Sequence, residues 1–264
     1  MPHWSLEDIA WHEFDRSQVT PGLVPLIKAA SMVEHNGYDY GRYLCEVFCD
    51  DAIFQEVARR WAEEEVQHGR ALRKWAELAD PDFDFEKSFA TFTTGYTLPA
   101  NVAQSVRGSC CGELVARCMV EIGTSSYYTA IKDSTDEPVL KELCGRIAAD
   151  EFRHYKLFYS HLQRYLEKDK LGTWQRLKIL LSRVAESEDD ELAYAFYAAH
   201  NPGTGYNRKA YARYYLAAVG TCYRKEHIER MVMMVFKTVG LKPQPILSRC
   251  ASFLAWNFMR LRMG

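Results

Sequence analysis

Residues 144–154 read CGRIAADEFRH, and residues 62–69 read AEEEVQHG. Each stretch contains a glutamate and a histidine three residues apart, namely Glu151 and His154 in the first and Glu65 and His68 in the second. Because an α-helix has about 3.6 residues per turn, side chains at this spacing lie on one face and can reach the same cation. The two pairs therefore predict two helices that each present a carboxylate and an imidazole to a metal ion.

A further glutamate precedes each pair at a matching distance. Met32-Val33-Glu34 recurs 87 residues later as Met119-Val120-Glu121. The interval from Glu34 to Glu65 is 31 residues and that from Glu121 to Glu151 is 30. After an antiparallel turn, the two glutamates of each interval therefore lie at the same height along neighbouring helices. The chain therefore contains an internal repeat of two helical hairpins. The predicted metal ligands are Glu34, Glu65, His68, Glu121, Glu151 and His154.

Helical periodicity extends from these motifs over most of the chain, and no segment has the alternation of a strand, so the predicted class is all-α. Pro25 and Pro138 suit the first turns of helices, and Asp50 or Asp51 can cap the second helix. Residues 80–106 break the pattern and are long enough to cross a bundle. We expect helices at about residues 24–49, 52–78, 107–133, 138–167, 173–187, 189–199, 207–239 and 245–262.

Two hairpins joined by a crossover predict a four-helix bundle over residues 24–168. Residues 1–23 form an N-terminal extension in this prediction, and residues 169–264 add C-terminal helices packed on the bundle. The 48% of hydrophobic residues allow a sizeable core. Eight cysteines without a CxxC motif argue against a disulfide framework, a zinc ribbon or an attached rubredoxin.

The motifs resemble those of the soluble acyl-carrier-protein desaturases, within the larger ferritin-like di-iron group. Residues 65–69 with Leu72 and Lys74 are similar to that family's second-helix motif, and residues 144–154 to its fourth-helix motif. The resemblance covers about residues 30–165. It implies a ferritin-like bundle that binds two iron ions, uses O₂ as co-substrate and removes hydrogen from an unactivated C–H bond.

Thr124 lies three residues after Glu121 and matches a threonine that this family keeps beside its oxygen site. The resemblance therefore implies that Thr124 is a catalytic residue that helps to deliver protons. A core threonine bonded to the backbone of its own helix is the alternative.

Carboxylates beside the ligands are candidates for a supporting role. A metal-bound histidine usually donates its second N–H to a carboxylate. The pseudo-symmetry of the repeat pairs Asp150 with His68 and Glu64 with His154. The alternative is that both acids are surface residues on charged helices. Five further histidines lack partners at ligand spacing and are expected to be structural: His12, His35, His161, His200 and His227.

These features together predict a di-iron oxidase, either a desaturase or a hydroxylase, that acts on an acyl chain or another apolar substrate. A mixed manganese–iron pair suits the same ligands. The alternatives are an oxygenase of a small molecule or amine, a rubrerythrin-like peroxide reductase, and a non-catalytic metal-binding or storage protein. An oxidase of this type needs an electron donor, either a ferredoxin-like protein or another reductase.

Basic residues gather in the last quarter of the chain. Residues 206–264 contain eleven Lys or Arg and two Glu, which gives a charge of +9. Because the net charge of the chain is −2, the first 205 residues carry a charge of −11. The asymmetry favours an acidic carrier protein or an anionic lipid as a partner. A solvated basic face, or pairing with the acidic part of the chain, is the alternative. We expect the apolar residues of the last helix to be its buried stripe rather than a membrane contact: Phe253, Leu254, Trp256, Phe258 and Met259.

The first fifteen residues, MPHWSLEDIAWHEFD, are acidic and polar, unlike a signal peptide. No apolar run approaches the roughly 18 residues that a bilayer-spanning helix needs. We therefore expect a cytoplasmic protein. We also expect a homodimer without a nucleic-acid partner.

Overall fold

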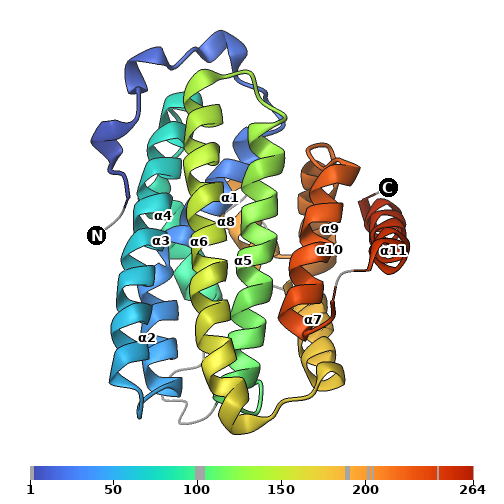
Figure 1. Ribbon diagram of the computed structural model, residues 1–264. Coiled ribbons are helices and arrows are strands. Elements are labelled where there is room, and N and C mark those ends of the chain that lie inside the picture. The colour runs from blue at the N-terminus through green and yellow to red at the C-terminus, as the bar shows by residue number, and fades with distance from the viewer. Residues whose placement is uncertain are drawn as a thin grey trace. The chain divides into compact units, whose positions relative to one another are not determined.

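The computed structural model describes residues 3–98, 105–187, 191–200, 203, 205–242 and 244–263. Every regular element within these residues is a helix, which confirms the predicted all-α class and gives a helical bundle (Figure 1). No helix among the described residues is long and apolar enough to span a bilayer.

Three short 3-10 helices precede the α-helices, at Leu6–Asp8, Trp11–Glu13 and Arg16–Gln18. The α-helices are α1 Val24–His35, α2 Gly37–Val47, α3 Ala52–Ala79, α4 Phe85–Gly95, α5 Cys110–Lys132, α6 Pro138–Asp169, α7 Thr173–Ser187, α8 Glu191–His200, α9 Arg208–Gly220, α10 Lys225–Val239 and α11 Pro245–Met263.

The chain divides into two compact units, and the long helix α6 begins in the first and continues in the second. The first unit consists of Met1–Ala103, Ser134–Leu143 and Ser187–Val219. The second consists of Gln104–Asp133, Cys144–Glu186 and Gly220–Gly264. The domain boundaries that we expected after residues 23 and 168 remain predictions.

Local signals fix where several helices begin. Asp51 caps α3 because its side chain accepts a hydrogen bond from the backbone N–H of Phe54. Ser109 caps α5 in the same way through the N–H of Gly112. Pro25 lies in the first turn of α1, as the sequence predicted. These signals fix the starts of three of the four helices that carry the predicted ligands, namely α1, α3 and α5.

Three predicted segments differ from the structure. The expected helix at residues 24–49 is two helices, because the chain turns at Asn36 before Gly37 begins α2. The expected helix at 207–239 ends at Gly220 and restarts at Lys225. There the extended Arg224 donates its backbone N–H to Nδ1 of His227. Residues 80–106, expected to be irregular, contain α4, which Asp84 caps. Residues 99–104 of that segment lie outside the described part of the chain.

The expected buried stripe of α11 is also wrong for three of its five residues. Phe253, Leu254 and Phe258 are exposed. Trp256 and Met259 do pack inward, against a cluster of α10. Hydrophobic periodicity shows which faces of a helix are apolar, but it does not show what covers each face.

In the first unit, α3 packs against α1 and α2 at very short range (Figure 1). A Cβ atom at Gly69 of α3 would lie 2.4 Å from the backbone nitrogen of His35, which no real Cβ atom tolerates. A Cβ atom at Gly37 would lie 2.7 Å from Cβ of Glu65. Glycine at these positions therefore lets the end of α1 lie directly on α3.

Glu137, the residue before α6, ties three parts of the first unit together. Its buried carboxylate accepts hydrogen bonds from Nε1 of Trp75 on α3 at 2.7 Å and from the N–H of Asp15 at 3.2 Å. It also caps α6 by accepting from the N–H of Leu140 at 2.7 Å. A carboxylate with several donors is strongly held. The start of α6 is therefore fixed against α3 and the N-terminal segment.

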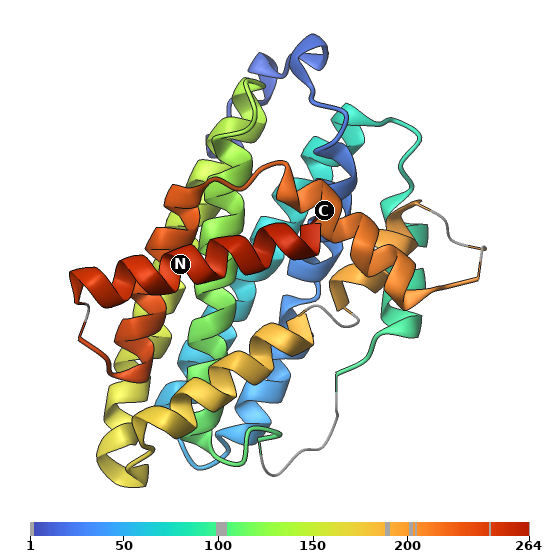
Figure 2. The ribbon, with the colours of Figure 1, turned by 90° about the vertical axis from the view of Figure 1, so that its right-hand side faces the viewer.

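In the second unit, α10 packs on α5 and α11 packs on α10 (Figure 2). Asp133, at the end of α5, holds the start of α10. Its carboxylate lies 3.1 Å from Nε2 of His227, and its carbonyl accepts from Arg224 at 2.7 Å. His227 therefore has the structural role that the sequence predicted.

Because α1 packs closely on α3, replacing glycine by alanine should have opposite effects on stability at Gly69 and at Gly123. In metal-free protein, we expect Gly69→Ala to lower the free energy of unfolding by about 1–3 kcal/mol, because His35 and its helix must move. Gly123→Ala is the matched control, since a Cβ atom at Gly123 meets no atom within 4 Å. It should raise the stability by up to about 1 kcal/mol through helix propensity. Urea denaturation followed by circular dichroism measures both, and equal effects would contradict the packing.

Candidate metal centre

Three of the six predicted ligands lie together in the first unit. Glu34 is in the last turn of α1, and Glu65 and His68 are one turn apart on α3. Nδ1 of His68 lies 4.0 Å from Oε2 of Glu34 and 3.8 Å from Oε2 of Glu65. All three side chains are buried, and His68 is completely inaccessible.

The other three predicted ligands form an equivalent triad in the second unit. Glu121 comes from α5, whereas Glu151 and His154 come from α6. Nδ1 of His154 lies 3.7 Å from Oε2 of Glu121 and 3.9 Å from Oε2 of Glu151. Each of these residues is at most 2% exposed. The two halves of the sequence repeat thus build the same arrangement of two carboxylates and one imidazole.

The donor set of each triad fits one cation. Within a triad, each residue offers one ligand atom within 4.8 Å of the others. The separations between histidine and glutamate are too long for hydrogen bonds. Two atoms that each bind one ion at about 2.1 Å, however, can lie up to about 4.2 Å apart. Two buried carboxylates also repel each other unless a cation or a proton neutralises them. Imidazole with carboxylates suits iron, manganese or zinc.

Thr124 contacts the second triad directly. Its Oγ1 donates to Oε2 of Glu151 at 2.6 Å, whereas the backbone carbonyls of Val120 and Glu121 lie farther away, at 3.2 and 3.4 Å. Both alternatives from the sequence thus have a structural basis, but the bond to the carboxylate is the shorter one and is charge-assisted. The catalytic role of Thr124 remains a prediction.

The two carboxylates that we expected to support the histidines, Asp150 and Glu64, differ in their burial. Asp150 is buried and accepts a hydrogen bond from Arg153 one turn later on α6. Glu64 is half-buried on α3. The predicted pairing of Asp150 with His68 and of Glu64 with His154 stays a prediction.

Trp4 lies against the first triad, a contact that the sequence did not predict. Its indole stacks on the imidazole of His68 with ring centroids 5.9 Å apart and planes inclined by 10°. Trp4 is itself only 6% exposed. The N-terminal segment therefore covers one face of a predicted ligand and keeps water from it. Trp4 lies outside the two repeated motifs, so the sequence gave no signal of this contact.

His35, which we expected to be structural, packs edge-on against aromatic rings. Its ring centroid lies 5.2 Å from that of Phe85 and 4.9 Å from that of Phe89. Burial, with smaller contributions from Arg70 and Arg73, lowers the pKa of His35 below its usual range. A neutral imidazole among aromatic rings is a packing residue, as the sequence predicted.

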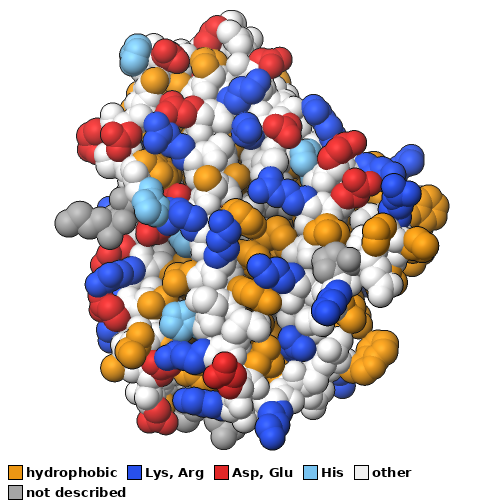
Figure 3. All heavy atoms as spheres, viewed as in Figure 1, with side chains coloured by type: hydrophobic (Ala, Val, Ile, Leu, Met, Phe, Trp, Pro, Cys, Tyr) orange, Lys and Arg blue, Asp and Glu red, His pale blue; other side chains and the backbone are white. Residues whose placement is uncertain are grey.

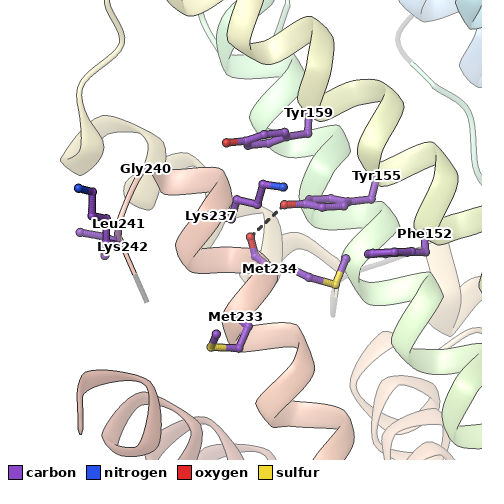
Figure 4. A pocket seen from close by; sticks show the side chains of 9 residues that line it. All are labelled: Phe152, Tyr155, Tyr159, Met233, Met234, Lys237, Gly240, Leu241 and Lys242. Carbon is purple, nitrogen blue, oxygen red and sulfur yellow. Dashed lines mark hydrogen bonds between the residues drawn. The ribbon is translucent and has the colours of Figure 1, made fainter. Parts of the chain in front are cut away.

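A hollow of about 490 Å³ opens on the second unit (Figure 4). It is lined by Phe152, Tyr155 and Tyr159 of α6, Met233, Met234 and Lys237 of α10, and Gly240, Leu241 and Lys242 after it. The Tyr155 hydroxyl donates to the carbonyl of Met234 at 3.3 Å, and burial raises the pKa of Tyr155 to about 12. None of the predicted ligands lines the hollow, so we do not assign it to the metal.

A family model described as fatty acid desaturase matches residues 44–186. No curated protein matches the chain. The matched residues include Thr124 and every predicted ligand except Glu34. The inclusion of Glu34 therefore rests on the sequence repeat and on its position 4.0 Å from His68.

The two triads predict the metal content of the protein. We expect protein reconstituted with Fe(II) without oxygen to hold close to two ions per chain, and His68→Ala or Glu151→Ala to hold one ion or fewer, because each removes a ligand of one triad. His12→Ala is the matched control, since His12 is exposed and belongs to neither triad. Mass-spectrometric metal analysis measures the content. Two ions per chain in both ligand variants would contradict the assignment of these residues as metal ligands.

Proposed function

The chain belongs to the fatty acid desaturase family, and we propose on that basis that it is a ferritin-like di-iron oxidase that uses O₂ to desaturate or hydroxylate an acyl chain or another apolar substrate. The family places the chain among the oxidoreductases, and its buried acidic and histidine groups are compatible with metal binding. The observation that carries the proposal is the pair of equivalent triads, since each provides the ligands for one ion.

In this proposal the two triads share one dinuclear centre. Each triad by itself provides two carboxylates and one imidazole, which is half of a dinuclear ligand set. The sequence repeat supports the pairing of the two triads, and a dinuclear site needs all four carboxylates.

The stoichiometry of the reaction defines what else the protein needs. Bound iron supplies the chemistry that couples reduction of O₂ to oxidation of a C–H bond. Removal of two hydrogen atoms from a substrate yields two electrons and two protons. Conversion of O₂ to two water molecules requires four of each. An external donor must therefore deliver the other two electrons, and we assign this role to a ferredoxin-like protein or another reductase.

The residues beside the triads have roles that their contacts define. The hydroxyl of Thr124 holds its proton at Oε2 of Glu151, so it orients that carboxylate and is placed to pass a proton on. Trp4 covers the ring of His68 and excludes water from it. Thr124 thus contacts a predicted ligand of the second triad, and Trp4 contacts one of the first.

An acidic carrier protein is a candidate for presenting the acyl chain. Arg208, Lys209 and Arg213 are exposed on the first turns of α9. Clustered basic side chains speed the encounter with an acidic partner, and the rate then falls as salt rises. This role of α9 is part of the proposal.

Oxygen consumption tests the proposed activity. We expect protein loaded with two Fe(II) per chain to consume O₂ and, with an electron donor, to remove two hydrogens from an acyl substrate or add one oxygen, as mass spectrometry of the product shows. Glu121→Ala should abolish both reactions, because it removes a ligand. A protein that holds two irons yet reacts with neither O₂ nor substrate would contradict the proposal.

Thr124 offers a finer test in the same assay. We expect Thr124→Val to lower turnover by ~10–100-fold with metal content unchanged, because the hydroxyl contact with Glu151 is lost. Thr124→Ser is the matched control, since it keeps the hydroxyl and should retain most of the activity. Equal turnover in the parent and the valine variant would return Thr124 to a packing role.

A further inference from the structure

Helix α11 is apolar on two opposite sides. Its inner side packs Ala251, Ala255, Trp256 and Met259 against the apolar cluster of α10. Its outer side carries six large apolar residues that are between 45% and 83% exposed: Ile246, Leu247, Phe253, Leu254, Phe258 and Leu261. Packing on α10 therefore accounts for only one of the two apolar sides.

The outer residues form one continuous stripe. At about 100° per residue, Ile246, Phe253, Leu254 and Leu261 fall within one side of the helix. From Ile246 to Leu261 the stripe runs about 22 Å at a rise of 1.5 Å per residue. Exposed apolar side chains scattered singly are ordinary, whereas a contiguous patch marks a contact with another molecule or a membrane.

The charged residues of α11 itself, Arg249, Arg260 and Arg262, all have one sign. No acidic residue follows Glu229, while residues 230–264 contain six basic ones: Arg230, Lys237, Lys242, Arg249, Arg260 and Arg262. Arg249 and Arg260 are exposed and eleven residues apart, so they lie about three turns apart along the same edge of the stripe. Figure 3 shows hydrophobic and basic side chains side by side, with acidic ones near them, at the edge of the molecule where Figure 1 places α11.

We propose that α11 docks the protein on the surface of an anionic lipid bilayer. The outer stripe lies at the boundary between headgroups and acyl chains, and Arg249 and Arg260 reach the lipid phosphates along its edge. Helices with this combination bind in the plane of the interface, with a strength set by apolar area and by attraction to anionic lipid. The proposal does not depend on the metal centre.

The charge pattern favours a bilayer over a second copy of the chain. A symmetric contact between two α11 helices would bring Arg249 and Arg260 of both copies together, and the helix contains no acidic residue to pair with them. An anionic bilayer supplies that missing charge. Its fluid interior also accommodates large side chains that project from a convex helix without a complementary pocket.

Vesicle flotation of the full chain tests the docking surface. We expect binding to vesicles of equal parts phosphatidylglycerol and phosphatidylcholine, and little binding to phosphatidylcholine alone. Changing Phe253, Leu254 and Leu261 together to serine should abolish flotation. Ile53→Ser is a control, because Ile53 is 69% exposed on α3 and is not part of the stripe on α11. Circular dichroism checks that each variant is folded.

A second pair of variants separates charge from apolar area. Arg249→Gln with Arg260→Gln should weaken binding by roughly fivefold for each arginine, and added salt should weaken the parent in the same way. Arg59→Gln with Arg60→Gln makes the same change of charge on α3 and should have little effect. Three results would overturn the proposal: no flotation of the parent, equal losses in the control variants, or a dimer without vesicle binding that the triple serine change converts to monomer.

Discussion

The burial of four carboxylates inside a helical bundle is the constraint that the rest of this structure accommodates. Glu34, Glu65, Glu121 and Glu151 are nearly inaccessible to solvent. An unpaired buried carboxylate is costly, and two side by side cannot both stay ionised without a nearby positive charge. Each pair has a histidine within 4.0 Å, so the arrangement is compatible with binding a cation, whose charge would compensate the two carboxylates.

The scaffold meets this constraint through contacts that have no ligand role. Gly69 and Gly37 let α1 and α2 approach α3 closely enough for Glu34 to reach His68. Glu137 fixes the start of α6 against α3 by accepting the indole N–H of Trp75. Trp4 then covers His68 from the N-terminal segment. A protein that must hold polar ligands at set positions inside an apolar core needs such rigid support.

The clustering of these six side chains into two triads could be predicted from the sequence because its signal is local and repeated, whereas their role as ligands stays a prediction. A Glu-x-x-His pair needs only helical geometry to converge, and the recurrence of the Met-Val-Glu tripeptide linked each pair to a second glutamate. The helix breaks at Asn36 and before Lys225 escaped prediction because turn and capping contacts there, such as that between Arg224 and His227, override a continuous apolar pattern. Trp4 and the exposed side of α11 escaped it because they depend on tertiary packing, which a pattern of apolar residues does not encode.

In the proposed function the two triads bind one pair of ions, and anomalous X-ray scattering at the iron absorption edge tests this most directly. Crystals of Fe(II)-loaded protein should show two anomalous peaks per chain about 3.5–4 Å apart, the spacing of two-metal sites. One peak should lie beside His68 and the other beside His154. A single peak, or two peaks too far apart to share a carboxylate, would contradict the account.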